Sequence, residues 1–598
     1  MTTVDKRQIF LNEGRITIEK KLIYFRKRIR LISSLRVLMA LMAIFCFYEY
    51  LNLSQNWLWY LSLVFLAGFI FLVRFYFKFK DKFALELALQ GEYEMEIKYL
   101  AGELPNLEHE AQIELENHPF AQDLNLFGRR SLFHHVNRSF SNEGKVLLQS
   151  DLSERQPLAD VTERQNSLKE LEIHPEYILK YRSLGRGMEE KGPKVNDLIA
   201  IWREEPLKRI SLLLRIIMIV GQLFVAYALF QLIFQPSVET FKVLNYAVVF
   251  NLMVTFSQFK HLRKQQLLVS KLSDSMERYA NLIAHLEQHP FRSKALTEQL
   301  NSLGTSFKAS QSLRQLSAIL NSLEQMANVF VLIFLNGFFH YHLHRLHSLA
   351  KWKEKYAAHL SQWLQVTANF ELYSSYANYV QNHPDFHWPT QSEMQVLKAQ
   401  NLAHPLIPAT QRVANSFSFD DFRQMILTGS NMSGKSTFLR TVGLNLVLAK
   451  RGLTVAADDF TFYPFQVLCS MNPSDNIHEN TSYFQAEVIR LKGLLDSINA
   501  ERTSLLLLDE ILRGTNSDDK KEGTRLFLKK IAQLNCIGII ATHDIDISNL
   551  SESAADIFAA YYFESTVSGG NLNFDYKLRQ GVCLTPNATT LLRNYGII

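Results

Sequence analysis

Three short polar segments, each at the end of an apolar run, carry lysine, hydroxyl and carboxylate side chains. The first is Gly429-xxxx-Gly434-Lys435-Ser436, which follows an apolar run and precedes a helical pattern. Glycines at this spacing let backbone N–H groups turn toward phosphate oxygens, and a helix N-terminus adds a favourable dipole. The segment therefore predicts an ATP-binding loop in a strand-loop-helix setting. Its residues are Gly429, Ser430, Asn431, Met432, Ser433, Gly434, Lys435, Ser436 and Thr437.

The other two segments carry groups that hydrolysis of a phosphate bond requires. The run Leu505–Leu508 ends in Asp509 and Glu510, and the run Ile537–Ala541 is followed by Thr542-His543. Asp509 is suited to hold Mg²⁺, and Glu510 is suited to orient and deprotonate the attacking water. An imidazole at His543 could sense the γ-phosphate.

Within the loop itself, two side chains have predicted roles. Lys435 supplies a point charge to the terminal phosphates, and the Ser436 hydroxyl can bind Mg²⁺ together with Asp509. We therefore predict Lys435, Glu510 and His543 as catalytic residues, with ATP and Mg²⁺ as cofactors. Polar residues at the ends of several apolar strands are typical of a parallel sheet that binds its ligand at the carboxyl edge.

These segments, taken together, resemble the ATPase domain of the MutS family. The likeness covers nearly all of residues 400–595, and the Asn-Met pair inside the phosphate loop is one of its most specific features. The matching segments are His404-Pro405, Gly429–Thr437, Pro473–Asn476, Ser482–Glu487, Leu508–Thr515, Ala541–His543, Tyr576–Leu578 and Gly581–Cys583. A weaker likeness to the family's helical core occurs at Val136–Leu152, Asp160–Gln165 and Asn369–Ser375.

The resemblance implies a DNA-binding clamp switched by ATP, with a role in DNA repair or recombination. It also implies a homodimer with composite sites, in which Ser482 reaches the nucleotide bound by the partner subunit. Some positions depart from the family pattern. Leu512 stands where the family usually has glycine, and Asn480-Thr481 stands where it usually has Gly-Arg. No mismatch-reading domain is recognised, the usual C-terminal dimerisation helices are expected to be short or missing, and strong selectivity for a mismatch is not expected.

Four apolar stretches, arranged as two pairs, predict membrane insertion. They are residues 37–53 and 57–73, then 216–234 and 243–259. A helix needs about 20 largely apolar residues to cross the hydrocarbon layer, and within each pair the connection is short enough for a helical hairpin. Lys and Arg gather on the outer flanks of both pairs, while the hairpin tips hold almost none. The chain is therefore expected to be a multi-pass protein of a bacterial-type inner membrane, with the ATPase domain and both termini in the cytoplasm.

The rest of the chain before Pro384 shows helical spacing of apolar residues. Residues 267–286 and 356–379 predict long amphipathic helices, and residues 327–339 predict a buried helix that is too short to be a fifth span. His340, His342, His344 and His347 form a cluster in which three would share a helical face, although no acidic residue adjoins them. A metal site there is conceivable but not favoured.

The predicted fold is multi-domain, with transmembrane hairpins, an all-α MutS-like core and lever region, and a C-terminal α/β P-loop ATPase domain of the ABC type. We expect residues 1–110 to hold the first hairpin, 111–390 the helical core with the inserted second hairpin, and 391–598 the ATPase domain. A 47% hydrophobic and 20% charged composition excludes a disordered or fibrous chain. The net charge of +6 permits contact with DNA or anionic lipid but requires neither.

Two other functions stay open. An ATP-switched membrane scaffold without DNA binding would have core helices that lack a basic face, and the scattered basic residues of 263–294 do not decide this. A transporter-like ATPase is less favoured because the Leu-Ser-Gly-Gly signature is absent and four spans are few.

Overall fold

The computed structural model describes residues 3–53, 55–115, 118–186, 195–207, 209–235, 237–269, 272–304, 307–430, 432–471, 483–498, 502–513, 516–568 and 571–582. The chain divides into two compact units. One contains Met1–Arg138, Lys145–Ile178 and Tyr373–Ile598, and the other contains Ser139–Gly144 and Leu179–Leu372. The N-terminal hairpin and the C-terminal α/β region belong to the same unit. The expected domains 1–110, 111–390 and 391–598 stay a prediction.

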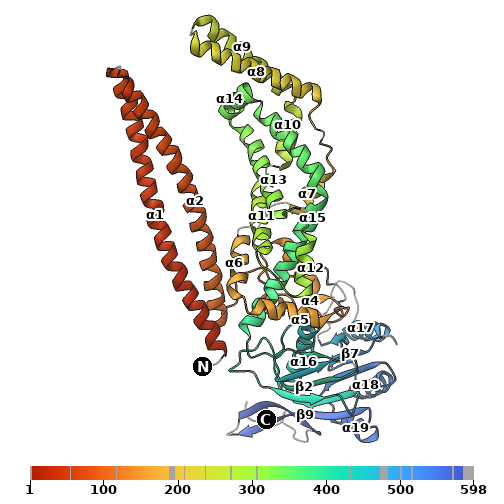
Figure 1. Cartoon of the computed structure of the whole chain (residues 1–598). Coiled ribbons are helices and arrows are strands. Elements are labelled where there is room, and N and C mark those ends of the chain that lie inside the picture. Colours follow the sequence, from red (N-terminus) through yellow and green to blue (C-terminus); the bar gives the residue numbers. More distant parts are fainter. Residues whose placement is uncertain are drawn as a thin grey trace. The chain divides into compact units, whose positions relative to one another are not determined.

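The N-terminal hairpin consists of two long helices, α1 (Thr3–Leu53) and α2 (Asn56–Leu100), which pack along each other (Figure 1). The predicted stretches 37–53 and 57–73 form the ends of these helices next to the turn. The remaining lengths are more polar, and at their base Gly14 of α1 lies directly against the ring of Tyr93 on α2. Each of the two helices contains a stretch that is long and apolar enough to cross a membrane.

Short helices follow the hairpin, and the last of them lies mostly in the second unit, which begins at Leu179 here. They are α3 (Leu132–Val136), α4 (Asn142–Ser153), α5 (Val161–Glu172) and α6 (Pro175–Gly185). A buried ion pair fastens α2 here, since the Arg138 guanidinium donates to the Glu96 carboxylate at 2.7 Å. Asn378 and Asn382 also donate to that carboxylate, so it is satisfied from several elements.

The second unit is almost entirely helical (Figure 1). Its elements are α7 (Val195–Glu204), α8 (Leu212–Phe234), α9 (Val238–Ser257), α10 (Phe259–Val269), α11 (Ser273–Glu287), α12 (Lys294–Ser302), α13 (Ala309–Glu324), η1 (Gln325–Ala327), α14 (Val329–Phe339) and most of α15 (Tyr341–Asn382). The predicted helix 267–286 is therefore two helices, whereas 356–379 lies within the single helix α15.

Helices α8 and α9 form the second predicted hairpin, and both are long and apolar enough to cross a membrane. Ser211 caps the first of them, and a capping box of Ser237 and Thr240 starts the second. The fourth apolar stretch was expected to run to residue 259, but α9 ends at Ser257 and the chain continues as α10.

Residues 327–339 differ from the prediction of a buried helix. A helix does form, but among its residues only Asn336 and Gly337 are buried, while Phe330 is 86% exposed. The histidine cluster also differs, because His340 adopts a left-handed conformation (φ 48°) that separates α14 from α15. His340 therefore does not share a helix with His342, His344 and His347, and no group of three or more metal-binding side chains occurs among the described residues.

The C-terminal region is an α/β domain with two sheets. The larger sheet has the order β10-β9-β4-β8-β7-β6, and the smaller one has the order β1-β5-β2-β3. The strands are β1 (Thr390–Gln391), β2 (Leu397–Leu402), β3 (Asn415–Ser418), β4 (Gln424–Gly429), β5 (Asp459–Phe462), β6 (Gln466–Ser470), β7 (Ser504–Asp509), β8 (Cys536–Thr542), β9 (Phe558–Ser568) and β10 (Asn571–Gln580). The helices are α16 (Lys435–Lys450), α17 (Tyr483–Ser497), α18 (Ser517–Ile531), η3 (Ile545–Asn549) and α19 (Leu550–Ser553).

The centre of the larger sheet is parallel and fully buried. Strands β9, β4, β8, β7 and β6 pair in parallel in that order, and only β10 is antiparallel to its neighbour. β7 and β8 are buried at every position because they lie in the middle of a sheet with both faces covered. The predicted combination of a mostly helical N-terminal part and an α/β C-terminal part is thus confirmed.

Candidate active site

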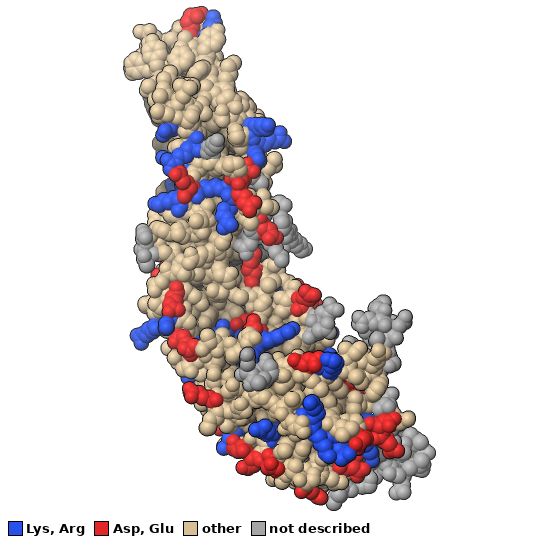
Figure 2. Space-filling view, turned by 90° about the vertical axis from the view of Figure 1, so that its right-hand side faces the viewer, with Lys and Arg blue, Asp and Glu red and all other residues tan. Residues whose placement is uncertain are grey.

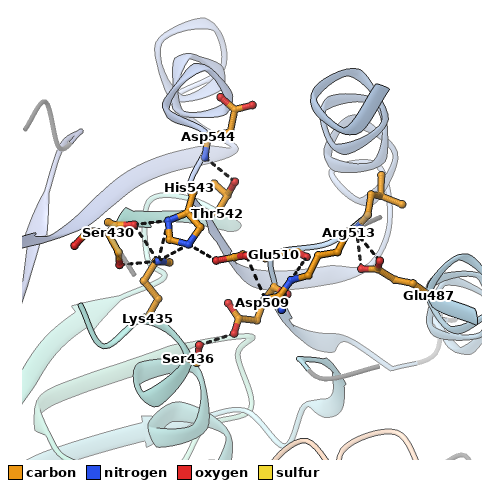
Figure 3. Close-up of polar contacts among 12 residues, drawn as sticks. Ser430, Lys435, Ser436, Glu487, Asp509, Glu510, Arg513, Thr542, His543 and Asp544 are labelled. Atoms are coloured by element: carbon orange, nitrogen blue, oxygen red, sulfur yellow. Dashed lines mark hydrogen bonds and ion pairs between the residues drawn. The ribbon is translucent and has the colours of Figure 1, made fainter. Parts of the chain in front are cut away.

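The register of the central strands brings the three polar segments to one edge of the sheet. Asp509 at the end of β7 pairs with Ala541 of β8, and Thr428 of β4 pairs with Thr542. The residues that directly follow these strands therefore lie side by side, as expected at the carboxyl edge of a parallel sheet. Figure 3 shows the resulting group, with Lys435, Asp509, Glu510 and His543 turned toward one another.

The loop between β4 and α16 has the backbone geometry that its glycines permit. Gly429 (φ 151°) and Gly434 (φ 104°) both have positive φ, which side chains with a Cβ rarely adopt. A Cβ at Gly429 would lie 2.7 Å from the Ser433 hydroxyl oxygen and 3.0 Å from the Phe563 carbonyl oxygen. The loop is therefore closed tightly against β9, and it leads into the N-terminus of a helix whose first residue is Lys435.

Lys435 is buried beneath this loop. Its ammonium group donates to the carbonyl oxygens of Gly429 at 2.9 Å and Ser430 at 3.1 Å. Burial lowers the pKa of Lys435 to about 8, although the carboxylates of Glu510 and Asp509 act in the opposite direction. The ring nitrogens of His543 lie farther from the ammonium, at 3.4 and 3.5 Å. A buried ammonium held mainly by neutral groups would gain strongly from an anionic phosphate within its reach.

Ser436 and Asp509 form a pair of oxygen donors. The Ser436 hydroxyl donates to the Asp509 carboxylate at 2.5 Å, which joins the start of α16 to the end of β7 (Figure 3). Hydroxyl and carboxylate oxygens are the ligands that Mg²⁺ prefers, and it is usually bound through one or two such groups plus phosphate and water. These two residues therefore fit the metal predicted from the sequence.

Glu510 lies in a left-handed conformation (φ 48°), and its backbone N–H donates to the Ala541 carbonyl at 2.9 Å. Its carboxylate forms an ion pair with His543, whose other ring nitrogen is 2.8 Å from the Gly429 carbonyl oxygen. The hydrogen bond with His543 lowers the pKa of Glu510 to about 2, and the nearby charge of Arg513 contributes in the same direction. Glu510 is therefore ionised, and in this arrangement it is a weak base.

Glu487 on α17 binds the backbone of the segment that follows Glu510, and this role was not predicted from the sequence. The Glu487 carboxylate accepts the backbone N–H groups of Leu512 at 2.7 Å and Arg513 at 2.8 Å. Leu512 has φ 60°, which is unfavourable for a leucine and explains why glycine suits this position in the family. By accepting the two N–H groups, Glu487 stabilises the turn in which Leu512 has this conformation.

A cavity of about 420 Å³ opens beside the loop. Tyr576 lines it and lies against Gly434, where an added Cβ would be 3.0 Å from the tyrosine ring. Tyr576 (φ 56°) occupies an irregular stretch of β10 that Asn415 holds, because the Asn415 amide donates to the Tyr576 carbonyl at 3.0 Å and accepts the Leu578 N–H at 2.8 Å. An aromatic ring in this place can stack on a flat base. In the sequence, Tyr576 belongs to a segment that matches the family, and its place at this cavity is not predicted.

Other predicted residues lie near the site or outside the described residues. Ser430, Met432, Ser433 and Thr437 belong to the loop and the first turn of α16, and Met432 is 86% exposed. Asn431 and Ser482 lie outside the described residues, as do the segments Pro473–Asn476 and Asn480-Thr481. The structure therefore gives no geometry for the predicted contact of Ser482 with a partner subunit.

The fold and this site define an α/β domain with a phosphate-loop motif at the carboxyl edge of its parallel sheet. Residues 425–592, which contain Lys435, Asp509, Glu510 and His543, match the family model for MutS domain V. The chain thus contains a MutS domain V over these residues, and the resemblance to the MutS family seen in the sequence is confirmed for this domain.

Similar proteins carry MutS names and match over the same region. The chain is 29% identical over 218 residues to Endonuclease MutS2 of Clostridioides difficile, a segment that covers 35% of this chain and 26% of that protein. It is 28% identical over 231 residues to the DNA mismatch repair protein MutS of Oceanobacillus iheyensis, covering 38% and 25%. It is also 27% identical over 279 residues to the mitochondrial DNA mismatch repair protein mutS homolog of Sarcophyton glaucum, covering 46% and 27%. The chain thus matches only about a quarter of the length of these relatives.

Proposed function

We propose that this protein is a membrane-anchored ATPase of the MutS type, which binds and hydrolyses ATP to switch a DNA-binding clamp. The observation that carries the proposal is the meeting of Lys435, Ser436, Asp509, Glu510 and His543 at one sheet edge within a MutS domain V. Mg²⁺-dependent release of phosphate from ATP by the purified full chain is the direct test of the enzymatic part.

In this proposal each side chain has a separate task. The loop N–H groups and Lys435 bind the phosphates, and the Tyr576 ring stacks on the base. Ser436 and Asp509 would hold Mg²⁺, which neutralises charge on the phosphates when it is bound. Glu510 takes a proton from water as the water oxygen bonds to the γ-phosphorus, and the bond from that phosphorus to ADP breaks.

The pairing of Glu510 with His543 is proposed to be the state of the site before ATP binds, in which hydrolysis is slow. A carboxylate with a pKa of about 2 accepts a proton from water poorly. We propose that His543 leaves Glu510 for the γ-phosphate when ATP binds, so that the base becomes stronger only in the loaded site. This would couple hydrolysis to the presence of the third phosphate.

Membrane anchoring is supported by the four long apolar helices α1, α2, α8 and α9. Large side chains on these helices are exposed, among them Leu41, Val64, Leu223 and Met253. Figure 2 shows a surface almost free of charged side chains over α8 and α9, with charged groups at the tip and a group of Lys and Arg below it. Lipid would cover such a surface, and the basic groups would lie among the head groups.

We expect the full chain to stay with the membrane fraction after alkaline extraction, because four apolar helices would hold it in the hydrocarbon layer. The measurement is the distribution of the untagged protein between pellet and supernatant, with a peripheral protein of the same membranes as the control. Recovery in the supernatant would contradict the proposed anchoring. A reporter fused after Ile598 should also behave as cytoplasmic.

DNA is the proposed partner because relatives of this domain are named as DNA mismatch repair proteins. Affinity is expected to depend steeply on salt, since it would come mainly from phosphate contacts that release counterions. Three such contacts would weaken binding about 40-fold between 50 and 200 mM salt. Mismatched and matched duplexes should bind with similar affinity, because no wedge residue is recognised that would unstack a base.

The measurement is the binding of homoduplex, mismatched duplex and four-way junction across a salt series, with and without ATP. A preference for the junction is compatible with the proposal, since a clamp can sense shape without touching base edges. Tight, salt-insensitive selection of a single mismatch would contradict it. A lack of DNA binding even at low salt would favour the membrane scaffold instead. The homodimer with Ser482 acting in trans is likewise part of the proposal.

A further inference from the structure

The helix α14 presents an apolar surface that continues the surface of the second hairpin. No charged residue occurs from Met326 to Phe339, and the exposed side chains of α14 include Phe330 at 86%, Phe334 at 58% and Val329 at 62%. α14 packs against α9, where Gly337 lies so close to Val248 that an added Cβ would be 2.8 Å from it. Phe338 joins the buried cluster between α8 and α9.

The direction and length of α14 exclude a simple crossing of the membrane. It has 11 residues and is bent by 113° from the preceding α13, with only Asn328 between η1 and its start. A helix of this length rises about 16 Å, roughly half of the hydrocarbon thickness. Its N-terminus is closed by the Asn328 side chain, which accepts the N–H groups of Phe330 at 3.0 Å and Val331 at 3.2 Å.

The C-terminal end of α14 is satisfied by polar side chains of the hairpin. The amide of Asn251 on α9 donates to the Gly337 carbonyl at 2.8 Å, and the amide of Gln222 on α8 donates to the Phe339 carbonyl at 2.8 Å. The last carbonyls of a helix have no partner within the helix, and in water they need none from the protein. In hydrocarbon they must be satisfied internally.

Two further contacts close the same end. The N–H of His340 donates to the Asn336 carbonyl at 3.2 Å, and the Asn336 side chain accepts the N–H of His342 at 3.0 Å. Asn251, Asn336 and His340 are all fully buried. The break between α14 and α15 is thus enclosed by protein, which is the condition under which irregular backbone occurs at membrane depth.

We infer that α14 is a third membrane-embedded element of this unit, a half-span that enters the hydrocarbon layer beside α9, with its end capped by Asn251 and Gln222. Its outward face, formed by Val329, Phe330, Ile333, Phe334 and Phe339, contacts lipid acyl chains. This inference rests on the proposed anchoring of α8 and α9. It also explains why those apolar helices carry an asparagine and a glutamine at these positions.

The test places a polarity-sensitive thiol label at one position in the full chain, reconstituted in phospholipid vesicles. Cys583→Ser serves as the background, because Cys46, Cys469 and Cys536 are buried. The three label positions are Phe334→Cys on α14, Leu223→Cys on α8 as the lipid reference, and Glu298→Cys on α12 as the aqueous reference. Quenching by a nitroxide on the acyl chain is compared with quenching by iodide in the buffer.

The label at Phe334 is expected to behave like that at Leu223, with strong quenching by the nitroxide lipid and several-fold weaker quenching by iodide than at Glu298. Iodide quenching equal to that at Glu298, while Leu223 stays in lipid, overturns the half-span but leaves the anchoring intact. Protection of the label at Phe334 from both quenchers contradicts contact of α14 with lipid. It indicates that another protein surface covers this face of α14. Strong quenching of the label at Leu223 by iodide would instead contradict the proposed anchoring of α8 and α9.

Loss of the cap provides a second, independent readout. Asn251→Leu and Gln222→Leu each leave a carbonyl of α14 without a partner, so iodide quenching at Phe334→Cys should rise several-fold. Tyr246→Leu, at an exposed position of α9, is the matched control and should leave quenching unchanged. Gln222 is only partly buried, so its variant remains informative if Asn251→Leu does not fold. Unchanged quenching in folded cap variants overturns the assigned role of these two amides.

Discussion

Replacing Glu510 by Gln is expected to lower ATP turnover by about 10²- to 10⁴-fold, because the amide keeps the shape of the side chain but cannot accept a proton from water. Nucleotide binding should persist, since the loop and Lys435 are untouched. The measurement combines phosphate release with the affinity for a fluorescent ATP analogue.

The matched control for this change is Glu522→Gln on α18, an exposed glutamate outside the site. It should leave both quantities as they are in the unaltered protein. Hydrolysis at the normal rate in Glu510→Gln would mean that another group activates the water. A loss of binding together with turnover would mean that Glu510 acts mainly by holding His543 and the loop.

Replacing Lys435 by Ala is expected to lower the affinity for nucleotide, whereas Glu510→Gln lowers turnover. The side chain is buried, and its ammonium lies among the carbonyls of the loop, where a hydrogen bond to a charged phosphate contributes about 1.5–3 kcal/mol. We expect ATP binding to weaken by about 10- to 150-fold, with a corresponding loss of hydrolysis at low ATP concentration. Titration of the fluorescent analogue measures this directly.

Because Lys435 also bonds the carbonyls of Gly429 and Ser430, the alanine variant needs a test of folding. Thermal unfolding without nucleotide should change little, since removing a buried ammonium also removes the cost of its burial. Lys529→Ala, an exposed position on α18, is the control for loss of positive charge. Normal affinity in Lys435→Ala would exclude this loop as the phosphate site.

Features that depend on neighbouring residues could be predicted from the sequence. The glycine spacing of the phosphate loop, the apolar runs of β4, β7 and β8, and the four long apolar helices all arise from residues close together in the chain. Such patterns reflect the spacing of apolar residues in a helix or strand, and this spacing repeats every few residues. The resemblance to the MutS family was inferred from the same local segments.

Some helix boundaries differ from the predicted ones, because an apolar spacing does not specify where a helix ends. Helix α10 ends at Val269 and α11 begins at Ser273, and the left-handed His340 ends α14, although the apolar spacing would allow a helix to continue at both places. The exposure of Phe330 and Phe334 could not be read from their apolar character, because the same residue types occur in a protein core and in contact with lipid.

The sequence by itself determined that a MutS-type domain is present, which residues can serve a phosphate site, and which helices are apolar enough for a membrane. Tertiary structure alone decided how the site is assembled: Glu510 pairs with His543, Glu487 holds the strained Leu512, and Asn415 holds Tyr576 at the cavity. It also decided that Asn251 and Gln222 cap α14. The physical reason is that each of these contacts joins residues far apart in the chain. Their meeting depends on strand register and helix packing, which no local repeat of residue types specifies.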